Sequence, residues 1–176
     1  MFESLQAHES QVSSHENRVF AFNRQATLAL MKKIYFASLA YLFLGLGFGV
    51  FYREFTKVNH FPESGVTQLS LVHTHLLTLG FMFLLIVLVL EKLFELSAQP
   101  LFTPAFWLFN AGLVLSTSIM VWHGIYQVLG KAFETSLSGI AGVGHIAMSL
   151  GILGISACLG NQIFVGARPP KNLDVG

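Results

Sequence analysis

Four long apolar segments dominate the chain, and polar breaks separate them. The segments cover residues 34–52, 68–90, 105–128 and 139–160. Each reaches the roughly 20 residues that a helix needs to cross the hydrocarbon core of a bilayer. The breaks concentrate proline, glycine and charge, which mark turns outside the hydrocarbon. The pattern predicts an all-α integral membrane four-helix bundle, with its four-transmembrane-helix domain at residues 34–160.

The two flanking segments are predicted to be cytoplasmic. In residues 1–33, apolar residues recur at helical spacing from Val19 to Ala29. This spacing is typical of an amphipathic helix that lies in the membrane interface. The alternative is a plain helical extension of the first span into the cytoplasm. Residues 161–176 form a cytoplasmic tail.

Lysine and arginine residues predict the orientation of the bundle. Seven of the ten fall on the side that holds both termini, and three fall on the other side. Because cytoplasmic segments carry the excess of positive charge, both termini are expected in the cytoplasm of a multi-pass cell-membrane protein. The seven are Arg18, Arg24, Lys32, Lys33, Lys92, Arg168 and Lys171, and the three are Arg53, Lys57 and Lys131.

Composition narrows the class of protein further. The chain is 53% hydrophobic and only 11% charged, whereas soluble domains carry roughly 25% charged residues. The formal net charge of +1 gives no reason to expect nucleic acid as a partner, so the lipid bilayer is the expected environment. Cys158 is the single cysteine, which excludes a disulfide or a thiolate metal cage within one chain. It is expected to be a small buried residue.

Four histidines interrupt the apolar segments: His73, His75, His123 and His145. Ionisable residues within membrane spans are rare, and they usually face a partner, a cavity or a bound ion. Counted inward from the predicted ends of the spans, all four lie roughly 8–10 Å below the outer surface. We therefore expect one layer of imidazoles, as metal or cofactor ligands or as packed, hydrogen-bonded histidines.

The spacing of His73 and His75 restricts what they bind. Residues two apart on an α-helix point about 200° apart, so both rings cannot ligate one centre. One is expected to face the bundle core, and the other a second pocket or a neighbouring subunit. Gly80 shares a face with His73 and leaves flat room that a planar macrocycle could use. Close helix packing through small residues is the alternative.

Haem b is the cofactor that these residues favour. Haem iron accepts neutral imidazole as an axial ligand and brings four nitrogens of its own, and no carboxylate is expected within a span core. Arg53, on the outer side, is a candidate partner for a haem propionate, although a solvated loop charge is the simpler interpretation. Copper or zinc on a histidine cluster is the competing ligand set.

The run His73-Thr-His75-Leu-Leu-Thr-Leu-Gly80-Phe resembles a His-x-His-Leu-x-x-x-Gly-aromatic pattern. That pattern belongs to small membrane proteins related to the haem–copper oxidase catalytic subunit, and nitric-oxide-response membrane proteins carry similar runs. The whole chain also resembles an uncharacterised family of short four-span bacterial membrane proteins. The resemblance implies that the paired histidines serve two haems on opposite sides. It also implies that a homotrimer mimics the three four-helix arcs of the oxidase subunit.

Three functions follow as expectations. The first is a membrane b-type haem protein for electron transfer or for binding a diatomic gas such as O2 or NO, and an oxidoreductase activity is compatible with it. The second is a transporter or carrier of copper, zinc or haem. The third is a structural subunit of a respiratory complex. The residues define neither an electron donor nor an acceptor.

Overall fold

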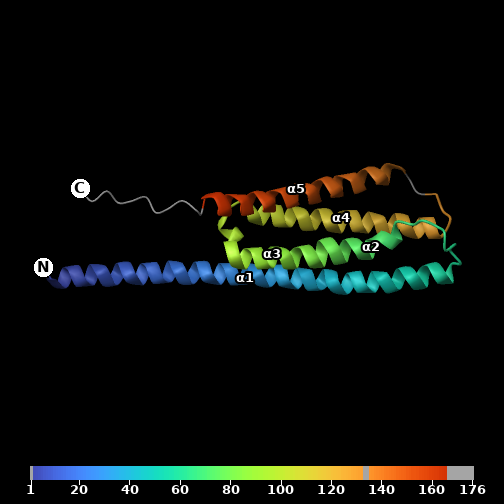
Figure 1. Ribbon diagram of the computed structural model, residues 1–176. Helices are drawn as coiled ribbons and strands as arrows, with labels where there is room; N and C mark the ends of the chain where they lie inside the picture. The colour runs from blue at the N-terminus through green and yellow to red at the C-terminus, as the bar shows by residue number, and fades with distance from the viewer. Residues whose placement is uncertain (1, 133–134, 166–176) are drawn as a thin grey trace.

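The computed structural model describes residues 2–132 and 135–165, and within these ranges it holds helices and no strands (Figure 1). A π-helix, η1, and a short 3₁₀-helix, η2, interrupt the α-helical elements. The elements in chain order are α1 (Phe2–Val58), α2 (Leu69–His75), η1 (Leu76–Met82), α3 (Phe83–Phe94), η2 (Leu96–Ala98), α4 (Phe102–Val128) and α5 (Thr135–Val165).

The four predicted spans are confirmed as helices. The segments long and apolar enough to cross a membrane are Thr27–Val58, Leu69–Phe94, Phe102–Val128 and Gly142–Phe164. The second of them joins α2, η1 and α3 into one helical rod without a break. The all-α architecture with four apolar helices therefore fits a multi-pass membrane protein.

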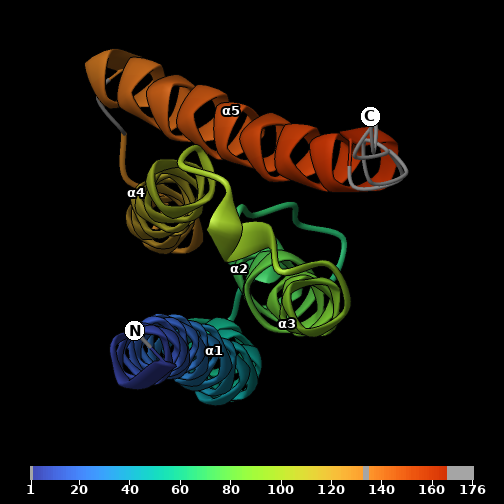
Figure 2. The same cartoon turned by 90° about the vertical axis from the view of Figure 1, so that its left-hand side faces the viewer.

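The helices stack in sequence rather than closing into a ring (Figure 2). Helix α4 packs closely against α5 on one side and against α2 on the other, whereas α1 packs against α2, η1 and α3. Helices α1 and α5 thus occupy opposite outer positions. This order leaves large apolar faces of every span exposed on the single chain, as lipid contact requires.

Glycines set the close approach of α4 to its two neighbours. A Cβ added at Gly144 of α5 would collide with Ser116 of α4, and one at Gly124 of α4 would collide with Leu69 of α2. Small residues that let helix backbones approach are the usual packing device in membranes. These two contacts also fix which residues share a depth, because Leu69 lies beside Gly124 and Gly144 lies beside Ser116.

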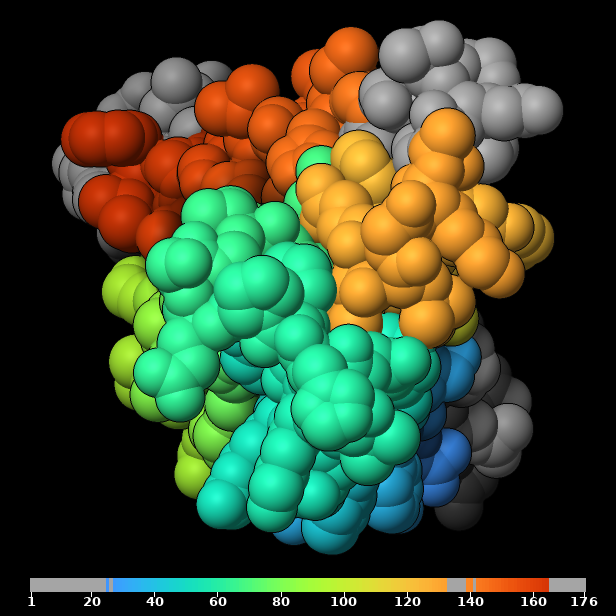
Figure 3. All heavy atoms as spheres, turned by 90° about the vertical axis from the view of Figure 1, so that its right-hand side faces the viewer, coloured from blue at the N-terminus to red at the C-terminus, as the bar shows by residue number. Residues whose placement is uncertain are grey.

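The bundle has two distinct ends. Helix α1 begins and α5 ends on one side, where α3 also turns into α4, and we call this the terminal end (Figure 1). The connections from α1 to α2 and from α4 to α5 form the other side, the loop end. Figure 3 views the loop end, where the end of α1 and the connection to α2 lie beside the end of α4.

The N-terminal segment is one helix with the first span. Helix α1 runs without interruption from Phe2 to Val58 and is straight (Figure 1). This geometry corresponds to a helical extension of the span rather than to a separate helix that turns to lie in the membrane interface. The four-helix architecture is confirmed, and the N-terminal segment is helical and continuous with the first span.

Two buried polar contacts hold the stack together. The Tyr41 hydroxyl on α1 donates to Asn110 Oδ1 on α4 at 2.9 Å. At the terminal end the buried carboxylate of Glu91 accepts from the Ser97 backbone N–H at 2.8 Å and from its hydroxyl at 2.5 Å. Glu91 thereby stabilises the turn from α3 into α4. Cys158 is buried, as predicted.

Candidate functional site

His75 has one ring nitrogen fixed by its own helix. Its Nδ1 lies 2.9 Å from the backbone oxygen of Leu71. Because a carbonyl oxygen only accepts, Nδ1 must carry the proton, and the lone pair then resides on Nε2. A ligand histidine usually donates its other N–H to a carbonyl or carboxylate in this way, which fixes the tautomer and orients the ring. His75 is therefore held in a form that can bind a metal through Nε2.

His145 on α5 lies next to His75. The two ring centres are 6.4 Å apart, and the ring planes are inclined by 85°. Ser116 Oγ on α4 lies 3.3 Å from His145 Nδ1. Two imidazoles on opposite sides of one metal ion, with metal–nitrogen bonds of about 2.0–2.1 Å, have ring centres about 6 Å apart. The observed separation matches that requirement.

The His75–His145 pair lies on an open side of the stack. Helices α2 and α5 both pack against α4 and make few contacts with each other. His145 is exposed and His75 is half-buried. This face belongs to the helices that are long and apolar enough to cross a membrane. A bulky apolar ligand can reach the two rings from the membrane, which a closed bundle would not permit.

His73 points to a different helix, as its spacing from His75 predicts. Its ring lies near Gly49 of α1, where an added Cβ would be 3.9 Å from the His73 side chain. The Nδ1 atom of His73 is buried and has no hydrogen-bond partner. A buried nitrogen without a partner costs about 1–3 kcal/mol. This orphaned atom marks the space between α1 and α2 as a second place where a donor or a metal would be accommodated.

The π-helix η1 begins at the residue after His75. π-helical segments are uncommon in proteins, but those that exist are often found at functional sites. Their wider turn changes the faces on which the residues before and after them lie. Here the π-helix lies between α2, which carries His73 and His75, and α3, which forms the rest of the span. No residue pattern predicts this π-helix, since Leu76–Met82 is an ordinary apolar run.

His123 lies nearer the loop end than the other three histidines. It precedes Gly124, which lies beside Leu69 at the start of α2. His123 is also seven residues from Ser116, or roughly 10 Å along α4, toward the loop end. Counted at about 1.5 Å per residue from the two glycine contacts of α4 described above, His73 lies roughly 6 Å, His75 roughly 9 Å and His145 roughly 13 Å from the level of Gly124 toward the terminal end. The four imidazoles therefore lie at graded depths, with His123 nearest the loop end. Among the residues that the structure describes, no three His, Cys, Asp or Glu side chains gather closely enough to hold a metal ion by themselves.

The space beside Gly80 is filled by protein. Gly80 is buried, and a Cβ added there would collide with the ring of Tyr41. The glycine therefore permits α1 and η1 to pack closely, and the flat room expected for a macrocycle is taken by Tyr41. The structure therefore supports the alternative interpretation of this glycine, which is close helix packing.

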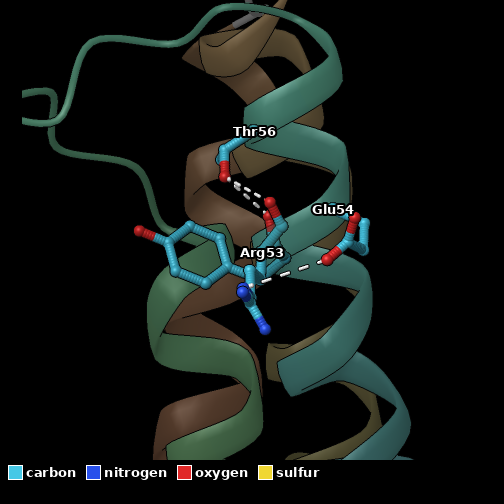
Figure 4. A network of polar contacts seen from close by, with 4 residues as sticks. Arg53, Glu54 and Thr56 are labelled. Atoms are coloured by element: carbon cyan, nitrogen blue, oxygen red, sulfur yellow. Dashed lines mark hydrogen bonds and ion pairs between the residues drawn. The ribbon is translucent and has the colours of Figure 1, made fainter.

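Arg53 lies at the loop end, on the last turns of α1 (Figure 4). Its side chain is 81% exposed, and its Nε lies 3.9 Å from Glu54 Oε1. The nearby Thr56 hydroxyl donates to the backbone oxygens of Tyr52 and Arg53 and so belongs to the helix itself. An exposed pair of this kind contributes little to stability. Arg53 is therefore an exposed surface cation close to the end of the bundle that carries the histidines.

Comparison with known proteins places the chain in a family. The model of a family described as a protein of unknown function, DUF2871, matches residues 31–162, so the chain belongs to this family. The matched region covers all four spans and all four intramembrane histidines. No curated protein and no solved structure matches the chain.

Proposed function

We propose that this protein is an integral membrane b-type haem protein that transfers single electrons or binds a diatomic gas. The observation that carries the proposal is the His75–His145 pair, with ring centres 6.4 Å apart and His75 Nδ1 bonded to a backbone oxygen. Haem needs only one or two protein ligands, because its ring supplies the other four. Bound haem supplies an iron that changes its oxidation state by one electron.

The residues divide into three roles under this proposal. His75 and His145 would hold the haem iron, and Ser116 Oγ contacts the second ring at its Nδ1 atom. His73, with its orphaned nitrogen on the opposite side of α2, is the candidate ligand of a second site. His123 and Arg53 lie toward the loop end, where the histidine contributes polarity and the guanidinium is placed to meet a propionate.

Paired imidazoles favour electron transfer over gas binding. When two histidines occupy both axial positions, no position is left open for a gas, whereas a single histidine leaves one open. The spacing of the rings therefore supports the electron-transfer form of the proposal. Gas binding would require His145 to leave the iron, or a second site at His73.

We further propose that the terminal end faces the cytoplasm of the cell membrane and that the protein assembles as a homo-oligomer, specifically a homotrimer. The charge distribution supports the orientation, because Lys32, Lys33 and Lys92 lie at the terminal end. The resemblance to one four-helix arc of the haem–copper oxidase subunit supports the trimer. Chemical cross-linking in the native membrane, followed by mass determination, tests the number of copies.

An absorption spectrum tests the haem proposal. Protein purified in mild detergent from cells supplied with haem precursor should display a Soret band that sharpens and shifts on reduction with dithionite. The variants His75→Ala and His145→Ala should lose or strongly weaken it. The matched control is His60→Ala, which changes an exposed histidine of the connection to α2. A spectrum without a Soret band, or an equal loss in all three variants, would contradict the proposal.

A carrier of copper or zinc is the second candidate function. The same pair of rings on the open side of the stack favours it, because imidazole is a suitable ligand for both copper and zinc. Metal analysis separates the two candidates. Stoichiometric copper or zinc without a Soret band would support the carrier. Neither metal nor haem would leave a structural subunit as the remaining expectation.

A further inference from the structure

A cleft of about 340 Å³ opens at the terminal end of the bundle, far from the histidines. Thr27, Leu30 and Lys33 of α1 line one side, and residues of the α3–α4 turn and the first turns of α4 line the other. The ends of three spans meet here. The cleft therefore lies at the depth where lipid headgroups join their acyl chains.

The cleft carries one charge of each sign. Lys33 and Glu95 both line it, and both side chains are exposed. Neither forms an ion pair with another described residue, since the ion pair recorded in the described part of the chain joins Arg53 and Glu54. An ammonium and a carboxylate that share a cleft without meeting form a site for a ligand that carries both charges.

The lining also includes apolar and aromatic side chains. Phe106 is buried, and Leu30 and the largely exposed Trp107 line the cleft with it. Ser97 and Thr103 add hydroxyl-bearing residues to the lining. Tryptophan is enriched where membranes meet water, because its ring is apolar and its N–H is polar. The cleft thus combines one ammonium, one carboxylate and apolar side chains, and this combination matches a charged amphiphile such as a lipid.

We propose that this cleft binds the headgroup of a phospholipid that carries a primary amine, as phosphatidylethanolamine does. Lys33 would donate to the phosphate, and the Glu95 carboxylate would accept from the ammonium. A choline headgroup offers no N–H to Glu95, and an anionic glycerol headgroup would meet the like charge of that carboxylate. The chemistry therefore favours the primary amine over both alternatives.

Lipid titration of the purified protein tests this site. Native mass spectrometry would count bound lipids with phosphatidylethanolamine, phosphatidylcholine and phosphatidylglycerol of identical acyl chains. We expect phosphatidylethanolamine to bind about tenfold more tightly than the other two, as one additional charge-assisted hydrogen bond allows. Equal binding of all three lipids would overturn the proposal.

Single substitutions separate the two charges. Glu95→Gln should remove the preference for the primary amine, whereas Lys33→Gln should weaken the binding of all three lipids. Lys32→Gln is the matched control, because Lys32 is exposed and does not line the cleft. An equal effect of the two lysine substitutions, or an unchanged preference in Glu95→Gln, would contradict the assignment. Melting temperatures of the lipid-free variants, which should equal that of the parent, verify that each variant is folded.

Discussion

The hydrogen bond between Tyr41 and Asn110 offers a quantitative test of the packing. It joins α1 to α4 across the core, with a length of 2.9 Å, and both side chains are at most 8% exposed. Tyr41→Phe removes the donor and leaves Asn110 Oδ1 buried. The amide cannot simply turn away, because Asn110 Nδ2 donates to the Phe106 backbone oxygen at 2.7 Å.

The expected magnitude follows from these contacts. Hydrogen bonds between membrane helices contribute about 0.6 kcal/mol on average and up to about 1.7 kcal/mol. An unsatisfied buried acceptor adds a cost, which is about 1–3 kcal/mol in the interior of a soluble protein. We therefore expect Tyr41→Phe to lower the free energy of unfolding by about 1–2 kcal/mol. Tyr35→Phe, which changes a tyrosine 45% exposed on the same helix, should change it by less than about 0.5 kcal/mol.

A double-mutant cycle isolates the bond itself. Tyr41→Phe, Asn110→Ala and the double variant would be unfolded reversibly in mixed micelles, and the free energies of unfolding compared. The coupling energy should lie between about 0.6 and 1.7 kcal/mol. A coupling below about 0.3 kcal/mol, within the additivity of independent sites, would refute the claim that this bond joins the two helices.

Three further predictions concern the turns and contacts around the candidate site. Gly144→Leu should lower the stability of the fold by about 1–3 kcal/mol, because the larger side chain overpacks against α4. Gly142→Leu is the control, because the space beside Gly142 is open, and only the first variant should show a lower melting temperature in detergent. Ser116→Ala should weaken haem binding about tenfold by freeing the His145 ring, measured by transfer of haem to apomyoglobin; an unchanged transfer rate would exclude this role. Glu91→Ala should cost about 1–3 kcal/mol by leaving the Ser97 N–H unpaired, measured by unfolding in denaturant, and a cost near zero would contradict the turn's dependence on it.

The spans were predictable because they depend on local sequence alone. A helix in hydrocarbon must form all its backbone hydrogen bonds within its own segment. A run of about 20 apolar residues therefore identifies a spanning helix without knowledge of its tertiary partners. The opposite directions of His73 and His75 were predictable for the same reason, since helical periodicity fixes them.

Features set by helix register were not predictable. The depth of His123 relative to the histidines of α2 depends on how α2 and α4 are aligned. The close packing of Gly124 against Leu69 sets this alignment. The room beside Gly80 depends on which neighbouring side chain fills it, and Tyr41 comes from another helix. Glu91 follows an apolar run, and its charge predicts an exposed position. In the structure its carboxylate is buried because it accepts a hydrogen bond from Ser97, six residues later. The π-helix has no local signature.

The ligation of one iron by both His75 and His145 is the central claim, and electron paramagnetic resonance of the oxidised protein tests it most directly. Two imidazoles with nearly perpendicular planes, as the 85° inclination predicts, give a low-spin ferric signal with very large anisotropy. His145→Ala should convert that signal to high spin. A high-spin signal in the parent protein, or a low-spin signal that His145→Ala leaves unchanged, would contradict the account.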